Sequence, residues 1–274
     1  MPTAAINGTR IFYQDDDFSD PWAQHKTVII QHGFCRNSNF FRAWTPWLAR
    51  RYRVIRADLR GCGQSGDPGT AYRYTMDGLI DDLTGLLDAL GIASAHYVGE
   101  GLGGMIGAEA ACRLPARFNS LTLVCTPVTV SAQTRRLQTN IQELGMHQWW
   151  LHSRGLTKDL SGDPAQDAYF ASEFARTPLH IAAALSSFVP TFNLAESLHN
   201  IKAPTLVMSP GASAQLPQHE QASLKTIPGV QWRTYEKLSG SMPFYEPDRL
   251  AKDALHFMMH TDGAIVGDVA APPP

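Results

Sequence analysis

Two periodicities alternate along the first half of the chain. Short runs of β-branched and apolar residues, each the length of a buried strand, are followed by segments whose apolar residues recur three and four positions apart, as on one face of a helix. The clearest helix follows Thr75, a capping residue, and ends before Gly91. The predicted strands are 27–31, 52–57, 95–99 and 120–125, and the predicted helices are 40–51, 76–90 and 102–113.

This alternation stops between residues 127 and 200, where the pattern is helical and aromatic, and then resumes. The later predicted strands are 204–208 and 231–235, and the later helices are 217–226 and 247–260. Strands that alternate with helices predict an α/β fold with a mostly parallel sheet and helices on both faces. We therefore expect a core from residues 1–126 and 201–262, an inserted helical lid over 127–200, and a flexible tail over 263–274.

Composition and charge narrow the classes of partner. Of the 274 residues, 44% are apolar and 18% are charged, which is enough apolar material for a buried core. The net charge of −2 provides no basic surface for nucleic acid and no attraction to anionic membranes. No apolar stretch is long enough to cross a bilayer. A small-molecule ligand is the expected partner, and the sequence leaves a homodimer open.

The four cysteines lie far apart and form no CxxC pair, so we expect reduced thiols in a cytoplasmic protein. The ten histidines form neither HExxH nor HxH. The sequence therefore predicts no metal site and no bound cofactor.

Four short motifs stand beside predicted elements. HGF at 32–34 and DLRGCGQS at 58–65 each follow a strand, GEGLGG at 99–104 joins a strand to a helix, and GSMPFYE at 240–246 precedes the last helix. Each motif alone is weak, but their order and context together are specific. Over nearly all of residues 8–260 the chain resembles the α/β-hydrolase superfamily, and in particular its small lidded enol-lactone and C–C bond hydrolases.

The resemblance locates three positions that hold a Ser-His-Asp triad in that superfamily. In the tight G-x-S-x-G turn the serine is replaced by Gly101, which carries no nucleophile. Ser241 stands where the general base histidine is expected, and a serine is a very weak base. Ser213 occupies the position aligned with the acid. These replacements predict that acyl-enzyme chemistry has no route here.

By the same resemblance, the backbone amides of Phe34 and Leu102 form an oxyanion hole that needs no particular side chain. Cys35 and Arg36 border it. Arg36 either binds a substrate carboxylate through two parallel hydrogen bonds or is an exposed surface arginine.

Candidates for proton transfer remain, each with a structural alternative. Glu100 precedes the replaced nucleophile and either exchanges a proton or supports the turn. His32 either faces the pocket or braces its loop. In the lid, His147 and His152 can replace the missing base from across the cleft, and His180 is a further candidate.

Two adjacent lid tryptophans, Trp149 and Trp150, cannot point in the same direction on a helix. Either one of them lines an apolar pocket suited to an aromatic or cyclic ligand, or both pack against the core.

Three functional hypotheses follow. The first is an enzyme of altered chemistry, a lyase, decarboxylase, isomerase or unusual hydrolase acting on a small cyclic or aromatic acid or ketone. The second is a catalytically silent protein that binds such a ligand. The third is a hydrolase with a displaced nucleophile or an activated water.

Overall fold

A single twisted sheet forms the centre of the molecule. The computed structural model describes residues 2–129, 134–156, 163–211 and 216–264. In these residues eight strands pair in the order β1-β2-β4-β3-β5-β6-β7-β8. The pairs β1–β2 and β2–β4 are antiparallel, and every later pair is parallel. The strands are β1 Thr3–Ile6, β2 Thr9–Asp16, β3 Thr27–Gln31, β4 Arg53–Ala57, β5 Ala95–Glu100, β6 Phe118–Val124, β7 Thr205–Pro210 and β8 Gln231–Tyr235.

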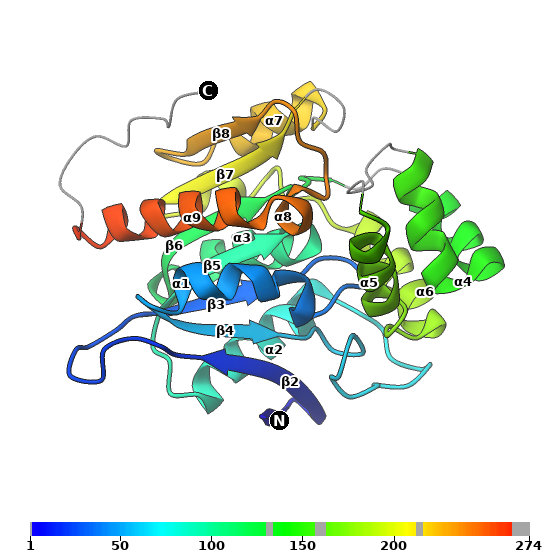
Figure 1. Cartoon of the computed structure of the whole chain (residues 1–274), viewed down its shortest axis with the longest axis horizontal. Helices are drawn as coiled ribbons and strands as arrows, with labels where there is room; N and C mark the ends of the chain where they lie inside the picture. The colour runs from blue at the N-terminus through cyan, green and yellow to red at the C-terminus, as the bar shows by residue number, and fades with distance from the viewer. Residues whose placement is uncertain (1, 130–133, 157–162, 212–215, 265–274) are drawn as a thin grey trace.

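Helices cover both faces of this sheet. Helices α1 and α9 lie on one face and α2 and α3 lie on the other (Figure 1). The central strand β3 is buried along its whole length, as its unbroken β-branched run predicts. The predicted α/β fold with a mostly parallel sheet is therefore confirmed. The helices of the core are α1 Thr45–Leu48, α2 Met76–Ala89, α3 Leu102–Arg113, α7 Gln218–Leu224, α8 Met242–Tyr245 and α9 Pro247–Thr261.

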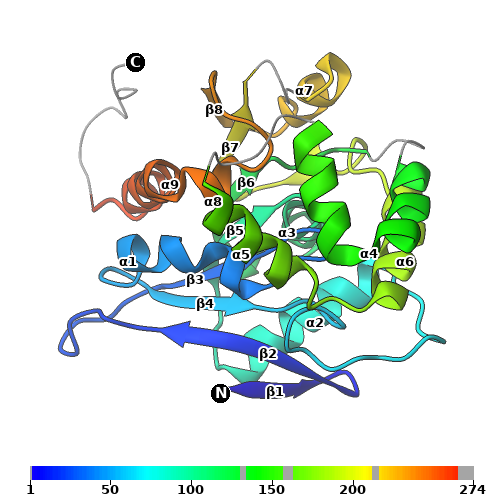
Figure 2. The ribbon, with the colours of Figure 1, turned by 45° about the vertical axis from the view of Figure 1, so that its right-hand side comes forward.

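Three helices between β6 and β7 gather beyond the carboxyl ends of the parallel strands (Figures 1 and 2). They are α4 Thr134–Leu156, α5 Pro164–Phe174 and α6 Leu179–Phe188, and we call them the helical insertion. Helix α4 is kinked at Gly145, whose φ of 72° is not helical. The insertion stands at the edge of an open α/β sheet where ligands usually bind. That it acts as a lid stays a prediction, and the predicted tail lies outside the described residues from 265 onward.

Two elements differ from the sequence prediction. The helix expected over 40–51 is a 3-10 helix, η1 Ser38–Trp44, followed by the single turn α1. Pro46 explains the break, because it has no N–H to continue the hydrogen-bond ladder and its ring would clash with the carbonyl four residues earlier. The hairpin β1–β2 was not predicted, although its turn at Asn7 and Gly8, both with positive φ, is an Asn-Gly hairpin signal.

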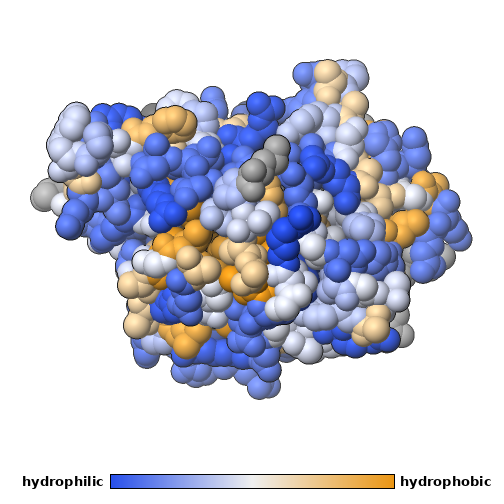
Figure 3. Space-filling view, turned by 90° about the horizontal axis from the view of Figure 1, so that it is seen from below, coloured by the Kyte–Doolittle hydropathy of each residue, from blue (hydrophilic) through white to orange (hydrophobic). Residues whose placement is uncertain are grey.

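The face in Figure 3 is mainly hydrophilic, with hydrophobic residues gathered to the left of its middle. No helix among the described residues combines the length and apolar character needed to span a membrane.

Candidate functional site

The turn between β5 and α3 has the backbone of a nucleophile elbow. Gly101 adopts φ 53° and ψ −117°, and its N–H donates to the carbonyl of Val124 on β6 at 3.1 Å. A side chain is strained in this region of backbone conformation, and glycine is not. A Cβ added at Gly101 would have only the Gly33 Cα within 4 Å, at 3.8 Å. The turn therefore keeps the elbow conformation, and a Cβ at Gly101 would meet no collision.

The flanking glycines of this turn have no such space. A Cβ at Gly103 would lie 2.3 Å from the carbonyl oxygen of Gln31, and one at Gly99 would lie 2.6 Å from the oxygen of Gly103. Both obstacles are backbone atoms, which cannot rotate away. The small residues of the motif are thus required by the close approach of α3 to strands β3 and β5.

The two amides predicted to form an oxyanion hole belong to the residues that follow Gly33 and Gly101 in the chain. Leu102 is the first residue of α3, so its N–H has no acceptor within the helix. Phe34 follows β3 and is next to Gly33, the residue nearest to Gly101. Among the described residues, neither amide donates a hydrogen bond to a protein acceptor. We call these two amides, with Gly101 between them, the cradle.

Glu100 is buried beneath the cradle and is bound on two sides. Its Oε2 accepts the N–H of Gly33 at 2.9 Å and a hydrogen bond from Arg36 Nη1 at 3.1 Å. Both partners come from the loop after β3, so the carboxylate fastens that loop to the elbow. This geometry supports the structural alternative for Glu100 over proton exchange.

Arg36 is also buried, and three aromatic rings surround its guanidinium. The centroids of Phe40, Trp150 and Phe244 lie 5.9, 5.6 and 5.0 Å from its Cζ. Such cation–π contacts are strengthened when water is excluded. Arg36 is therefore not a surface arginine, and its Nη1 is engaged by Glu100.

His32 is fully buried, and both ring nitrogens are bound to the backbone. Nδ1 lies 2.8 Å from the Gly33 oxygen, which can only accept, so Nδ1 carries the proton. Nε2 accepts the N–H of Leu59 at 2.9 Å. Burial lowers the pKa of His32 to about 3. The geometry supports the loop-bracing role, in which the imidazole stays neutral.

The neutral His32 predicts a loss of stability in acid. Its pKa in the folded state lies below the value of 6.5 in the unfolded chain, so the unfolded state gains the proton first as pH falls. This linkage should remove about 2 kcal/mol of the free energy of unfolding between pH 7 and pH 5. Measured by urea unfolding, the free energy of unfolding of the wild type should therefore fall by about 2 kcal/mol more than that of His32→Gln over the same pH interval. Equal losses in the two proteins would show that His32 is not a buried neutral ring.

The other two triad positions are differently placed. Ser241 is completely buried and stands immediately before α8, where its carbonyl accepts the N–H groups of Phe244 and Tyr245. Ser213 lies outside the described residues. Cys35 is completely buried with a φ of 55°, and burial raises the pKa of its thiol well above the usual value. Its geometry is that of a packed thiol and not of an activated nucleophile.

Sequence reasoning did not single out Cys125, which ends up beside the elbow. It directly follows Val124, the residue whose carbonyl accepts the Gly101 N–H, and it has a φ of 46°. Cys125 is half-buried. The signal in the sequence was its position at the end of a predicted strand adjacent to the elbow strand.

The two lid tryptophans are both buried in an aromatic cluster. Trp149 stacks on Phe174 with ring centroids 5.2 Å apart, and Trp150 contacts Phe40 edge-on at 5.4 Å. Trp150 thereby connects α4 to η1 and to the guanidinium of Arg36. The tryptophans pack against the core, and through Arg36 they also reach the residues that hold the cradle.

The three lid histidines differ in exposure and in partners. His147 is half-buried, and His152 is exposed. His180 Nε2 lies 3.0 Å from a carboxylate oxygen of Asp67, on the loop between β4 and α2. Among the described residues, no group of three or more His, Cys, Asp or Glu side chains is arranged to hold a metal ion.

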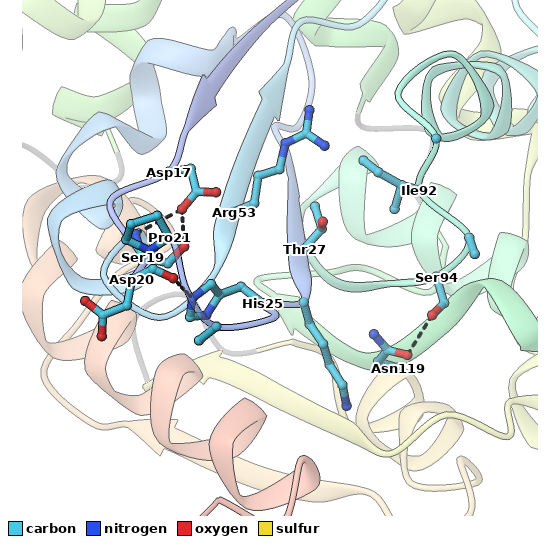
Figure 4. A pocket seen from close by; sticks show the side chains of 14 residues that line it. Asp17, Ser19, Asp20, Pro21, His25, Thr27, Arg53, Ile92, Ser94 and Asn119 are labelled. Atoms are coloured by element: carbon cyan, nitrogen blue, oxygen red, sulfur yellow. Dashed lines mark hydrogen bonds between the residues drawn. The ribbon is translucent and has the colours of Figure 1, made fainter.

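A large polar groove lies at the opposite, amino edge of the strands (Figure 4). It encloses about 660 Å³ and is lined by residues before or at the start of β3, β4 and β5, among them His25, Arg53 and Ser94. Its polar groups are bound to their neighbours: Arg53 pairs with Asp15 at 2.7 Å, and Ser94 donates to Asn119 at 3.0 Å. This groove shares no residue with the cradle.

A doubly wound sheet, an elbow between β5 and α3, and amides after β3 and at the start of α3 together define an α/β-hydrolase fold. The model of the α/β-hydrolase fold family matches residues 26–224, which is more than half of the chain. The protein belongs to this family.

Relatives and solved structures of similar shape agree with this assignment. The RutD protein of Klebsiella pneumoniae, named for carbamate hydrolysis, is 27% identical over 227 residues, which are 77% of this chain and 83% of the relative. The RutD protein of Pantoea ananatis is 36% identical, but the match spans only 42% of this chain and 41% of that relative. The enol-lactonase structure from Burkholderia xenovorans superposes with a TM-score of 0.83 at 23% identity, covering 94% of this chain and 100% of the other. At that identity the likeness establishes the fold alone.

Proposed function

We propose that this protein binds a small cyclic or aromatic carboxylic acid or ketone non-covalently, with the ligand's oxygen held by the amides of Phe34 and Leu102. The observation that carries the proposal is that the amides of Phe34 and Leu102 have no acceptor among the described residues, while a Cβ at the adjacent Gly101 would have only the Gly33 Cα within 4 Å. Fixed N–H donors at a helix N-terminus suit a carboxylate or a polarised carbonyl oxygen. The names of the relatives refer to a carbamate and an enol-lactone, both of which contain a carbonyl group.

Acyl transfer from the elbow position is absent from the proposal because the residue at that position carries no nucleophile and the nearby candidate bases are engaged. Gly101 has no hydroxyl, Glu100 is bound to Arg36 and Gly33, and both nitrogens of His32 are committed to the backbone. The helical insertion supports binding in another way, since its Trp150 contacts Arg36 beneath the cradle. The insertion would then close over the ligand as a lid.

Turnover of the same class of ligand is a second candidate function. The observation that favours it is the elbow conformation that Gly101 keeps beside the Leu102 amide, because fixed N–H donors can stabilise a developing negative charge. In this case the amides would stabilise an enolate or alkoxide formed during a lyase, decarboxylase or isomerase reaction, or an attacking water would replace the serine.

Leu102→Pro provides a direct test of the cradle. Proline removes one N–H at the first position of a helix, where its fixed φ is compatible with the backbone. Benzoate and cyclohexanecarboxylate, the probes in a calorimetric titration, should bind Leu102→Pro at least about tenfold more weakly, since a hydrogen bond to a charged group contributes about 1.5–3 kcal/mol.

Leu102→Met, which keeps the amide, is the matched control and should bind like the wild type. A fluorophosphonate reagent, which labels activated serines, should leave the protein unlabelled. Equal affinities in Leu102→Pro and Leu102→Met would exclude this cradle as the binding site. Product analysis of each probe after incubation separates the two candidate functions, because a silent binder returns it unchanged.

A further inference from the structure

A second groove lies between the core and the helical insertion. It encloses about 540 Å³ and is lined on one side by the loop before α2 and on the other by α6 and the short 3-10 helix η3 Val189–Thr191. We call it the seam groove. Its principal lining residues are Tyr72, Arg73, Tyr74, His180, Phe188 and Thr191. None of the cradle residues is among them.

Arg73 gives the seam groove a positive charge. Its Nη1 donates to the carbonyl oxygens of Thr70 at 3.1 Å and Tyr72 at 3.2 Å, which folds the side chain back over its own loop. Within the described part of the chain, no carboxylate forms an ion pair with this exposed guanidinium. The remaining donors of Arg73 are therefore available to an anion.

The carboxylate bound to the lining residue His180 is Asp67, and it is engaged by that histidine and by its own loop. Asp67 accepts hydrogen bonds from His180 at 3.0 Å and from the N–H of Gly69 at 2.8 Å. The hydrogen bond from His180 is the main reason that the pKa of Asp67 lies below its usual value. Asp67 thus remains charged at the rim, paired with the insertion and not with Arg73.

Aromatic rings form the apolar walls. Tyr72 and Tyr74 pack edge to face with centroids 5.0 Å apart, and the Tyr74 hydroxyl donates to the Arg60 carbonyl at 2.8 Å. Phe188 contributes the facing wall from α6. The guanidinium of Arg60 lies 5.1 Å from the Tyr72 centroid and holds that ring in place. Rings beside an unpaired cation are complementary to a flat ligand with one negative end.

We propose that the seam groove is a second ligand site, separate from the cradle, and that it takes a small aromatic carboxylate. The carboxylate binds Arg73, and the ring lies between Tyr72 and Phe188. The groove has the volume of an ordinary small-molecule site. Because its two walls belong to the core and to the insertion, a bound ligand also fastens α6 to the loop before α2. This site does not depend on the function proposed for the cradle.

The experiment measures binding of 2-naphthoate to the full chain by calorimetry, together with the neutral analogue 2-naphthamide. Arg73→Gln should weaken naphthoate binding at the seam groove at least tenfold, and the amide should bind the wild type at least tenfold more weakly than naphthoate does. Arg249→Gln is the matched control, since Arg249 is exposed beside the ring of Tyr235 at 5.1 Å but lines neither groove. It should change the affinity less than twofold.

Measurement in the Leu102→Pro background separates this site from the cradle. Naphthoate binding that persists in Leu102→Pro and is lost on adding Arg73→Gln supports the seam groove. Binding that Leu102→Pro abolishes and Arg73→Gln leaves unchanged places the ligand in the cradle only and overturns the proposal. Absence of any naphthoate binding to the wild type at millimolar concentration overturns it as well.

Discussion

Gly103→Ala should lower the free energy of unfolding by at least about 3 kcal/mol, because overpacking against rigid backbone forces the elements apart. The added Cβ would lie 2.3 Å from the Gln31 oxygen and 2.7 Å from the His32 oxygen. Neither atom can move without displacing β3 from α3. Urea unfolding followed by circular dichroism measures the loss. If the variant cannot be purified, its melting temperature is measured on the soluble fraction of a cell lysate.

Gly101→Ser in the same turn is the matched control. Its Cβ meets only the Gly33 Cα, at 3.8 Å, so the change carries the strain of a positive φ and no collision. The expected loss is about 1 kcal/mol. If Gly103→Ala proved no more damaging than Gly101→Ser, the close approach of α3 to β3 would be wrong. If Gly101→Ser increased stability, the turn would not be an elbow.

Arg36→Met should destabilise the protein by about 3–5 kcal/mol, because it leaves the buried Glu100 carboxylate without its cation. Methionine fills a similar volume among Phe40, Trp150 and Phe244, so the loss reports the charge and not a cavity. Chemical unfolding at pH 7 gives the magnitude.

The double variant Arg36→Met with Glu100→Gln is the control for this interpretation. Replacing both charges removes the unpaired carboxylate, and the glutamine oxygen can still accept the Gly33 N–H. The second substitution should therefore recover about half or more of the lost stability. Additive losses from Arg36→Met and Glu100→Gln would mean that the two side chains do not act as a pair.

The central strands were predictable because they are short and largely apolar, and β3 is a β-branched run buried along its whole length. The predicted strand 27–31 coincides with β3, and the helix expected to end before Gly91 is α2 Met76–Ala89. Local signals decided both cases. In residues 40–51 the apolar spacing favours one continuous helix, but Pro46 interrupts it. The structure has a 3-10 helix followed by the single turn α1. The Asn7–Gly8 pair is a hairpin signal and would have predicted the β1–β2 hairpin.

The site was predictable as a list of positions but not as a set of contacts. The motif GEGLGG located the elbow, whereas the pairing of Glu100 with Arg36 joins residues 64 positions apart. Single-sequence patterns contain no information on such a distance. For the same reason, His180 was expected at the pocket, and the structure places it on the seam groove beside Asp67.

The uncrowded Cβ position at Gly101 also bears on how side chains could be introduced into this turn. A glycine codon becomes a serine codon by one base change, and the hydroxymethyl group would enter unobstructed space at Gly101. A hydroxyl could therefore be introduced there without a collision, at the loss of about 1 kcal/mol that the positive φ carries. Ser241 has no such freedom, since it is sealed at the start of α8 and a larger imidazole must displace packed neighbours. Placing a histidine at position 241 would therefore be the harder of the two changes needed to build a Ser-His pair in this fold.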